Sequence, residues 1–290
     1  MLEKQHFSIV ILATATGGGL EITMVKLVIS DMDGTLVNSK DELPEDLFER
    51  IEQLKQIGVR FVIASGRQYY NLEKRFESVK DDIIVIAENG AMIYDHGTCI
   101  HVDKMEYESV ETFILLLREH TEVVTVLCGA KSAYIETKDE EFFRKLRQYY
   151  ERVEVVDDLL VAAKEDDICK IAVFNEISSE KYIYPLLQPY EDEFKLAVSG
   201  NFWLDIMQRG IDKGTGIQKI QEYYQITPKE CMAFGDYMND YEMMQVCEYS
   251  YAMANAHPEL KEICKYETQS NNENGVVREL VRFFGLDSMK

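Results

Sequence analysis

The feature that most constrains this chain is an apolar run that ends in two aspartates. Residues 25–29 read Val-Lys-Leu-Val-Ile, and residues 31–36 read Asp-Met-Asp-Gly-Thr-Leu. The run is typical of a strand buried on both faces of a parallel α/β sheet. Ligands bind such sheets beyond the carboxyl ends of the strands, where Asp31 and Asp33 fall. Gly34 then allows a tight turn and a close approach to a ligand. An Asp-x-Asp pair alone is more often an ordinary acidic turn.

Length and charge narrow the class of protein. The chain has 290 residues, enough for one large domain or two moderate ones. Its net charge of −21 argues against nucleic acid as a partner, because too few basic residues are present to neutralise phosphates. Six cysteines are scattered without a Cys-x-x-Cys pair. That spacing suits reduced thiols in a cytoplasmic protein better than disulfides or a zinc site.

The first 23 residues differ in composition from the rest of the chain. Residues 7–15 are apolar, but Glu3 and Lys4 cancel one another, so the positive start of a signal peptide is missing. The apolar run is also too short to span a bilayer, and no other stretch is long enough. We therefore expect residues 1–23 to be an extension outside the fold, and we expect no association with a membrane.

The chain then alternates between strands and helices. Strands are expected at residues 59–64 and 83–87, with helices at 44–57 and 68–79 between the strands, followed by a hairpin from residues 92–101. Short links between such elements indicate right-handed crossovers and a parallel sheet. The alternation resumes at Asp212, with a further strand at residues 231–234.

Residues 104–207 have a different pattern, with strands in neighbouring pairs and helices between them, including one expected helix over Ser179–Tyr190. The sequence therefore predicts an α/β protein: a Rossmann-like parallel-sheet core, formed by residues 24–103 and 208–290, with an inserted α+β cap domain at residues 104–207.

Three further stretches place polar side chains at the edge that carries Asp31. Ser65 ends the second strand, Lys213 opens a helix after the insert, and Asp236 and Asp240 follow the strand at residues 231–234. Each alone would be an ordinary capping or solvated residue. Together, the carboxylates would repel one another without a cation, and their hard oxygens suit Mg²⁺. Lysine and serine supply donors for a phosphoryl group. The set predicts a site for phosphate and magnesium.

These motifs resemble a known family. From about Met24 to Phe284 the chain is similar to Cof-type members of the haloacid dehalogenase (HAD) superfamily, the phosphatases with a large α+β (C2-type) cap. Besides the Asp31–Leu36 motif, the resemblance rests on stretches 89–91, 211–214, 235–240 and 270–276. Asn274 and Asp205 depart from the usual aspartate and glutamate, and Asp205 is expected to adjust a cap hinge or a substrate contact.

The resemblance implies a role for each residue. Asp31 is the nucleophile that forms an aspartyl-phosphate, and Asp33 is the general acid and base. Magnesium is held by the Asp31 carboxylate, the Asp33 carbonyl and Asp236. Phosphate-binding residues are Ser65, Gly66, Lys213 and Asn239, and Asp240 supports them from a second layer. Asn89 and Arg67 either contact the substrate or are structural turn residues.

The function expected from this resemblance is hydrolysis of small phosphorylated metabolites, with sugar phosphates as the expected substrates. A phosphomutase of the same superfamily and a non-catalytic phosphate-binding regulatory protein are the alternatives. The intact Asp31 and Asp33 pair argues against the non-catalytic protein. The expected partner is a small-molecule phosphate ester, and nothing in the sequence implies a protein partner.

Overall fold

The computed structural model describes residues 12–16, 19–147, 149–199 and 201–288. Two compact units divide the chain. The first contains residues up to Ser65, Ser78–Ile84 and the chain from Ile217 onward, and the second contains Gly66–Glu77 and Val85–Gly216.

The first unit is built on parallel strands around β3. Its strands are β3 (Leu27–Asp31), β4 (Arg60–Ala64), β14 (Cys231–Gly235), β15 (Tyr249–Met253) and β16 (Tyr266–Thr268). They follow the order β16-β15-β14-β3-β4, and each neighbouring pair runs parallel. All five residues of β3 are buried, as expected for a strand covered on both faces.

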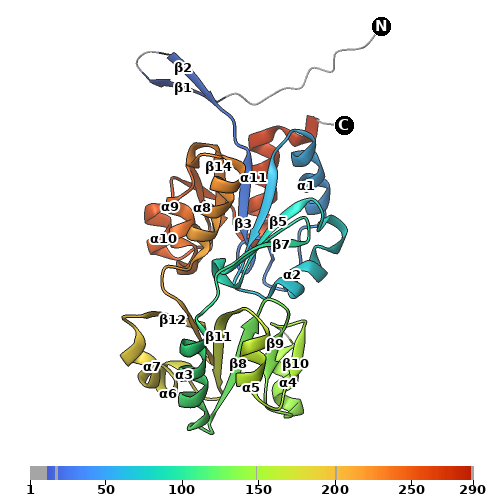
Figure 1. Ribbon diagram of the computed structural model, residues 1–290. Coiled ribbons are helices and arrows are strands. Elements are labelled where there is room, and N and C mark those ends of the chain that lie inside the picture. The colour runs from blue at the N-terminus through green and yellow to red at the C-terminus, as the bar shows by residue number, and fades with distance from the viewer. Residues whose placement is uncertain (1–11, 17–18, 148, 200, 289–290) are drawn as a thin grey trace. The chain divides into compact units, whose positions relative to one another are not determined.

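Helices cover this parallel sheet on both sides. They are α1 (Leu47–Gln56), α8 (Lys213–Tyr224), α9 (Tyr241–Gln245), α10 (Pro258–Ile263) and α11 (Gly275–Phe284). Figure 1 shows α9 and α10 on one side of β3 and α1 and α11 on the other. In α1 the buried residues Leu47, Ile51 and Leu54 recur at helical spacing, so one apolar stripe faces the sheet. This arrangement confirms the predicted α/β class.

Strand β5 (Ile83–Ala87) crosses from the first unit into the second. The order of the eight-stranded sheet continues from it through β6 (Met92–Asp95) and β7 (Thr98–Val102), which form the predicted antiparallel hairpin. Helix α2 (Tyr69–Arg75) also belongs to the second unit. The short 3-10 turns of the chain are η1 (Glu77–Val79), η2 (Glu88–Gly90), η3 (Gln188–Tyr190), η4 (Pro228–Glu230), η5 (Met238–Asp240), η6 (Asn271–Glu273) and η7 (Leu286–Ser288).

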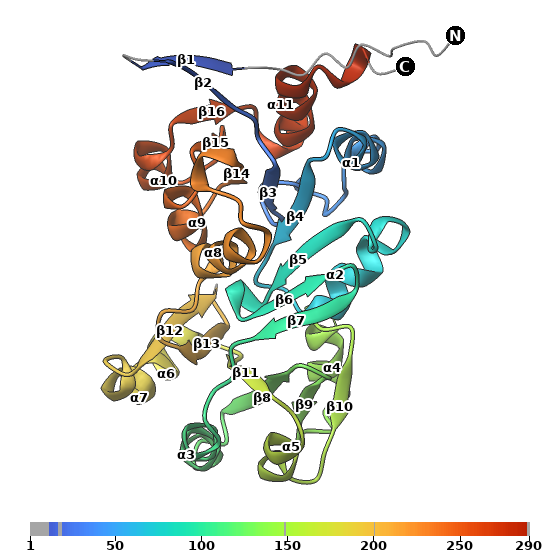
Figure 2. The ribbon, with the colours of Figure 1, turned by 45° about the horizontal axis from the view of Figure 1, so that its top comes forward.

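The second unit also holds a six-stranded mixed sheet in the order β10-β9-β8-β11-β13-β12 (Figure 2). Its strands are β8 (Val123–Gly129), β9 (Ala133–Ile135), β10 (Val153–Val155), β11 (Ile168–Asn175), β12 (Phe194–Ser199) and β13 (Trp203–Gln208). Its helices are α3 (Tyr107–Arg118), α4 (Glu140–Leu146), α5 (Leu159–Glu165), α6 (Ser179–Tyr182) and α7 (Tyr184–Leu187). Residues of α3 and α5 pack with alternate residues of the sheet, such as Ile171 and Leu204, in one apolar core.

Four elements differ from the sequence expectations. The single helix expected over Ser179–Tyr190 is wrong: α6, α7 and η3 replace it, because Pro185 and Pro189 each stand at the start of a new turn. Strands β10 and β16 and helix α5 were not expected.

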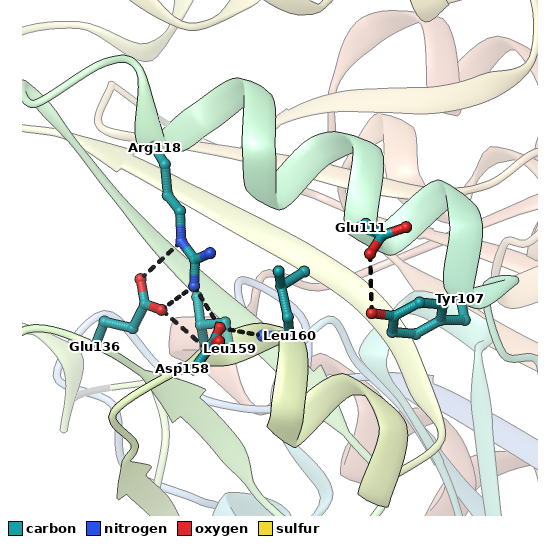
Figure 3. A network of polar contacts seen from close by, with 7 residues as sticks. All are labelled: Tyr107, Glu111, Arg118, Glu136, Asp158, Leu159 and Leu160. Atoms are coloured by element: carbon teal, nitrogen blue, oxygen red, sulfur yellow. Dashed lines mark hydrogen bonds and ion pairs between the residues drawn. The ribbon is translucent and has the colours of Figure 1, made fainter.

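An arginine of α3 ties this helix to the start of α5. Arg118 forms ion pairs with Glu136 and with Asp158, which lies 2.6 Å from the Arg118 Nη2 atom (Figure 3). The same carboxylates accept hydrogen bonds from the first amides of α5, Leu159 N to Glu136 and Leu160 N to Asp158, both at 2.9 Å. The two acids therefore cap a helix while they neutralise an arginine.

The amino-terminal residues give a separate pair of strands. Strands β1 (Leu12–Thr16) and β2 (Gly19–Thr23) form a two-stranded antiparallel sheet of their own. The remaining residues of the expected extension, 1–11 and 17–18, lie outside the described part of the chain, and the extension stays a prediction. Within the described residues, no helix is both long and apolar enough to cross a membrane.

Candidate active site

The site begins at the carboxyl end of β3. Asp31 is the last residue of this strand and is buried. It pairs with Ala64 at the end of β4, so Ser65 follows at the same sheet edge and is buried as well. On the other side, Ser30 pairs with Phe234, which brings the end of β14 and the following Asp236 to that edge. Asp31, Ser65 and Asp236 therefore lie at the same edge of the sheet, as the strand order predicts.

A tight turn follows β3 and turns Asp33 toward solvent. The carbonyl of Met32 accepts hydrogen bonds from the amides of Leu36 and Val37, both at 3.0 Å, and Asp33 forms a parallel β-bridge with Val37. Asp33 is exposed, whereas Asp31 is buried. Two aspartates separated by a single residue therefore lie in different environments.

Gly34 lets this turn approach Asp236. Its φ of +83° is in the region that favours glycine, and an added Cβ atom would lie 2.2 Å from the Asp236 Oδ2 atom. The neighbouring Thr35 hydroxyl donates a 2.8 Å hydrogen bond to Asp236 Oδ1, and Asn255 Nδ2 donates to the Gly34 carbonyl at 2.8 Å. Thr35 and Asn255 were not predicted as site residues, although Thr35 stands inside the first motif.

Asp240 shapes the loop that carries Asp236. Its fully buried carboxylate accepts hydrogen bonds from the amides of Asp236 (3.0 Å) and Tyr237 (3.2 Å). An added Cβ atom at Gly235 would lie 2.7 Å from Asp240 Oδ2, so the backbone and the carboxylate are in close contact. Asn239, in the same turn η5, is exposed.

Three of these carboxylates form a group that fits a divalent cation. One oxygen each from Asp31, Asp236 and Asp240 lies within 4.8 Å of the others. Hard, anionic oxygen donors are those that Mg²⁺ prefers. The predicted ligands Asp31 and Asp236 belong to this group, and Asp240, predicted as a supporting residue, belongs to it too.

The remaining predicted residues lie in the second unit around η2. An added Cβ atom at Gly66 would lie 2.8 Å from the Asn89 Oδ1 atom, and one at Gly90 would lie 2.0 Å from the Asp212 carbonyl oxygen. The stretches around residues 66, 89 and 212 are therefore packed together by glycines. Arg67 is half-buried and donates a hydrogen bond to Asn71 at 3.2 Å.

Lys213 is fully buried at the first position of α8. The start of this helix is fixed by Asp212 and Thr215: the Thr215 amide donates to Asp212 Oδ1 at 2.8 Å, and the Asp212 amide donates to the Thr215 hydroxyl at 3.0 Å. The stretch expected to present Lys213 is thus held by a reciprocal cap.

A buried ion-pair network in the second unit was missed by the sequence reasoning. The Lys170 Nζ atom lies 2.5 Å from Glu88 Oε2 and 3.6 Å from Asp205 Oδ2. Burial acts to lower the pKa of Lys170, but the carboxylates of Asp205 and Glu88 raise it well above its ordinary value. A lysine inside the mostly apolar strand at residues 168–175 is the signal that could have revealed this network.

A model of the haloacid dehalogenase-like hydrolases matches residues 28–280. The chain belongs to this family. The predicted family and the predicted phosphatase activity are thereby confirmed, and the substrates are small phosphate esters.

Curated relatives carry phosphatase names. The chain is 30% identical over 256 residues to the 5-amino-6-(5-phospho-D-ribitylamino)uracil phosphatase YbjI of Escherichia coli, covering 87% of this chain and 94% of that protein. It is 26% identical over 274 residues to YitU of Bacillus subtilis, a phosphatase of the same name, covering 90% of this chain and 98% of that protein. A haloacid dehalogenase-like hydrolase from Bacteroides thetaiotaomicron shares the fold, with a TM-score of 0.80, 23% identity and coverage of 89% and 99%.

Proposed function

We propose that this HAD-family phosphatase hydrolyses sugar phosphates and related polyol phosphates with Mg²⁺, through an aspartyl-phosphate intermediate. The observation that carries the proposal is the group formed by Asp31, Asp236 and Asp240 beyond the central parallel strand. The two relatives above support the substrate class, since both are named for a compound whose phosphate is carried by a ribityl chain.

Asp31 is the nucleophile in this proposal. Its carboxylate oxygen attacks phosphorus, a new oxygen–phosphorus bond forms, and the bond from phosphorus to the substrate oxygen breaks. Its place at the end of a strand held by two parallel neighbours gives it a fixed position for this attack.

Asp33 moves the protons. It donates a proton to the leaving alkoxide, and it then accepts one from the water that attacks the aspartyl-phosphate. This second step releases inorganic phosphate and restores the Asp31 carboxylate. Its exposed side chain suits a group that exchanges protons with an incoming substrate and with water.

Donors and a cation complete the proposed site. Ser65 and Lys213 bind the phosphoryl oxygens, with Gly66 and Asn239 as further contacts and Asn89 and Arg67 toward the rest of the substrate. Asp31, Asp236 and the main-chain carbonyl of Asp33 would hold Mg²⁺, which neutralises negative charge when bound. Asp240 orients Asp236 by accepting a hydrogen bond from the Asp236 amide.

In this proposal, residues 104–207 form the cap, and residues 24–103 and 208–290 form the core.

The test is release of inorganic phosphate from a panel of sugar and polyol phosphates. Asp31→Asn preserves size but removes the attacking charge, so kcat should fall by about 10³-fold or more. The exposed Asp157 provides a matched control, because Asp157→Asn makes the same change far along the sequence from the predicted motifs. A well-folded Asp31→Asn protein with wild-type turnover would contradict the covalent mechanism.

The metal requirement is tested separately. We expect a chelator to abolish turnover and added Mg²⁺ to restore it. Ca²⁺ should not restore turnover, because its larger and looser coordination misplaces the oxygen ligands. Full turnover in the presence of chelator would contradict the metal part of the proposal while leaving the role of Asp31 in place.

A further inference from the structure

Lys170 occupies an unusual place for a lysine, the interior of a buried strand. All eight residues of β11 are buried, and the Lys170 side chain is 4% exposed. Side chains alternate along a strand, so Lys170 and Phe174 face away from Ile171 and Val173, which belong to the core beneath α3 and α5. Lys170 therefore lies on the opposite face of the six-stranded sheet.

Two carboxylates meet Lys170 on that face. Asp205 comes from the neighbouring strand β13, and Glu88 comes from the turn η2 after β5. Their side chains are 8% and 2% exposed. Removing three charged groups from water is costly, and a buried triad of this kind is weak evidence for stability. The function of the triad therefore lies in the segment that it holds, the η2 turn that contains Glu88.

The held segment is a turn with unfavourable backbone angles. Glu88 and Asn89 have φ values of +50° and +55°, a region that residues other than glycine seldom adopt. The Glu88 amide donates to the Arg67 carbonyl at 3.1 Å, and Gly90 packs on the Asp212 backbone next to Lys213. The turn is thus in contact with the stretches around residues 67 and 212, which, like the turn itself, were predicted to belong to the site.

Asn89 is the side chain that this turn presents. Its Oδ1 atom is buried, and no residue in the described part of the chain donates a hydrogen bond to it. Gly66 leaves room for the amide, since an added Cβ atom would collide with it. A buried acceptor without a donor is costly and is expected where a ligand completes the hydrogen bonding.

We propose that Lys170 is a positioning residue, which pins Glu88 and thereby holds the η2 turn in the conformation that presents Asn89 to the substrate. Asp205 shares the ammonium and fixes its place on the sheet. Lys170 thereby affects a substrate contact, that of Asn89, although Lys170 itself does not contact the substrate. This inference rests on the proposed role of Asn89 in substrate binding.

The test removes the three charges together. Lys170→Met alone leaves two carboxylates without their cation and is expected to destabilise the fold. The triple variant E88Q/K170M/D205N keeps the side-chain sizes and leaves no buried charge in the network. The Tm of the triple variant should be closer to the wild-type Tm than the Tm of the Lys170→Met variant is. Its kcat/KM for a polyol phosphate should fall on the order of 10²-fold, because Asn89 is misplaced.

A double-mutant cycle with Asn89→Ala decides whether the loss runs through Asn89. In the N89A background the triple substitution should lower kcat/KM by less than about twofold, because the contact is already gone. Lys145→Met is the matched control: it removes the same charge from an exposed ion pair of this unit, 2.9 Å from Glu176, and should leave kcat/KM unchanged.

Two results with the triple variant would overturn the inference, and so would a third with N89A alone. One is a triple variant with altered Tm and wild-type kcat/KM, which would make the network purely structural. The other is an additive loss in the N89A background. If N89A itself has wild-type kcat/KM, the role of Asn89 fails and the inference with it. The phosphatase proposal, tested at Asp31, survives that outcome.

Discussion

At the scale of single residues, the two aspartates of the first motif differ in exposure. Asp31 ends a strand buried on both faces, and Asp33 lies in the turn that follows and is exposed. The turn is closed by the Met32 carbonyl and by Gly34, whose φ of +83° no other residue adopts readily. This difference suits a fixed nucleophile beside a group that exchanges protons.

The first prediction at this scale concerns Asp33→Asn. A general acid matters most when the leaving group is a poor one, since a sugar alkoxide needs a proton and nitrophenolate leaves largely unaided. The substitution should therefore slow phosphoryl transfer from a sugar phosphate much more than transfer from p-nitrophenyl phosphate. Rapid-quench measurement with the nitrophenyl ester should show a burst of protein-bound phosphate, because water activation is also lost. Equal slowing of both esters without a burst would assign Asp33 to geometry instead.

Some residues of the site could be predicted from the sequence, and others could not. The order of motifs along a parallel sheet was enough to bring Asp31, Ser65 and Asp236 to one edge. Thr35 and Asn255 were not foreseen, because their contacts with Asp236 and Gly34 join positions about 200 residues apart. Lys170, Glu88 and Asp205 were missed as a group because they come from three different elements, β11, η2 and β13. A sequence places a side chain on an element, but pairing between distant elements depends on packing.

At the scale of elements, the predicted strands were those with continuous apolar runs. Strand β5 has the predicted bounds, and every one of its residues is buried. Strands β10 and β16 are three residues long, lie at sheet edges and are largely exposed, so no apolar run announced them. The helix expected over Ser179–Tyr190 failed because the two prolines outweighed its apolar spacing.

The prediction at this scale concerns the junction of α3 and α5. The Arg118 guanidinium lowers the pKa of Asp158, and the Leu160 amide lowers it further. Because the folded-state pKa lies below the unfolded one, the stabilisation is present above the unfolded pKa and is lost as the pH falls through the folded pKa. Arg118→Met should therefore raise the pKa of Asp158 toward its ordinary value, measured by carboxyl NMR titration.

The exposed Arg144 of α4 gives a matched control for this measurement. Arg144→Met removes the same charge from the same unit and should leave the pKa of Asp158 where it is. An unchanged titration in the Arg118→Met protein would mean that the α5 amides alone set this pKa. The ion pair drawn in Figure 3 would then contribute geometry without an electrostatic effect.

At the scale of the whole molecule, chemistry and substrate choice are expected to belong to different parts of the chain. The proposed nucleophile, the carboxylate group and the parallel sheet lie in the first unit. The proposed cap residues 104–207 contribute a separate sheet and an apolar core of their own. A region with its own core can change its surface residues without disturbing the strand that carries Asp31.

The last prediction follows from this division. Exchanging residues 104–207 for the matching segment of Escherichia coli YbjI should change the order of preference among sugar, polyol and nucleotide phosphates. Turnover of p-nitrophenyl phosphate should change less, because a small activated ester makes few contacts beyond the phosphoryl group. A protein in which the native segment is reinserted through the same junctions controls for damage at the joints. If the exchanged protein keeps the native order of preference, the specificity lies in the core, and the turn that presents Asn89 becomes the first place to look for it.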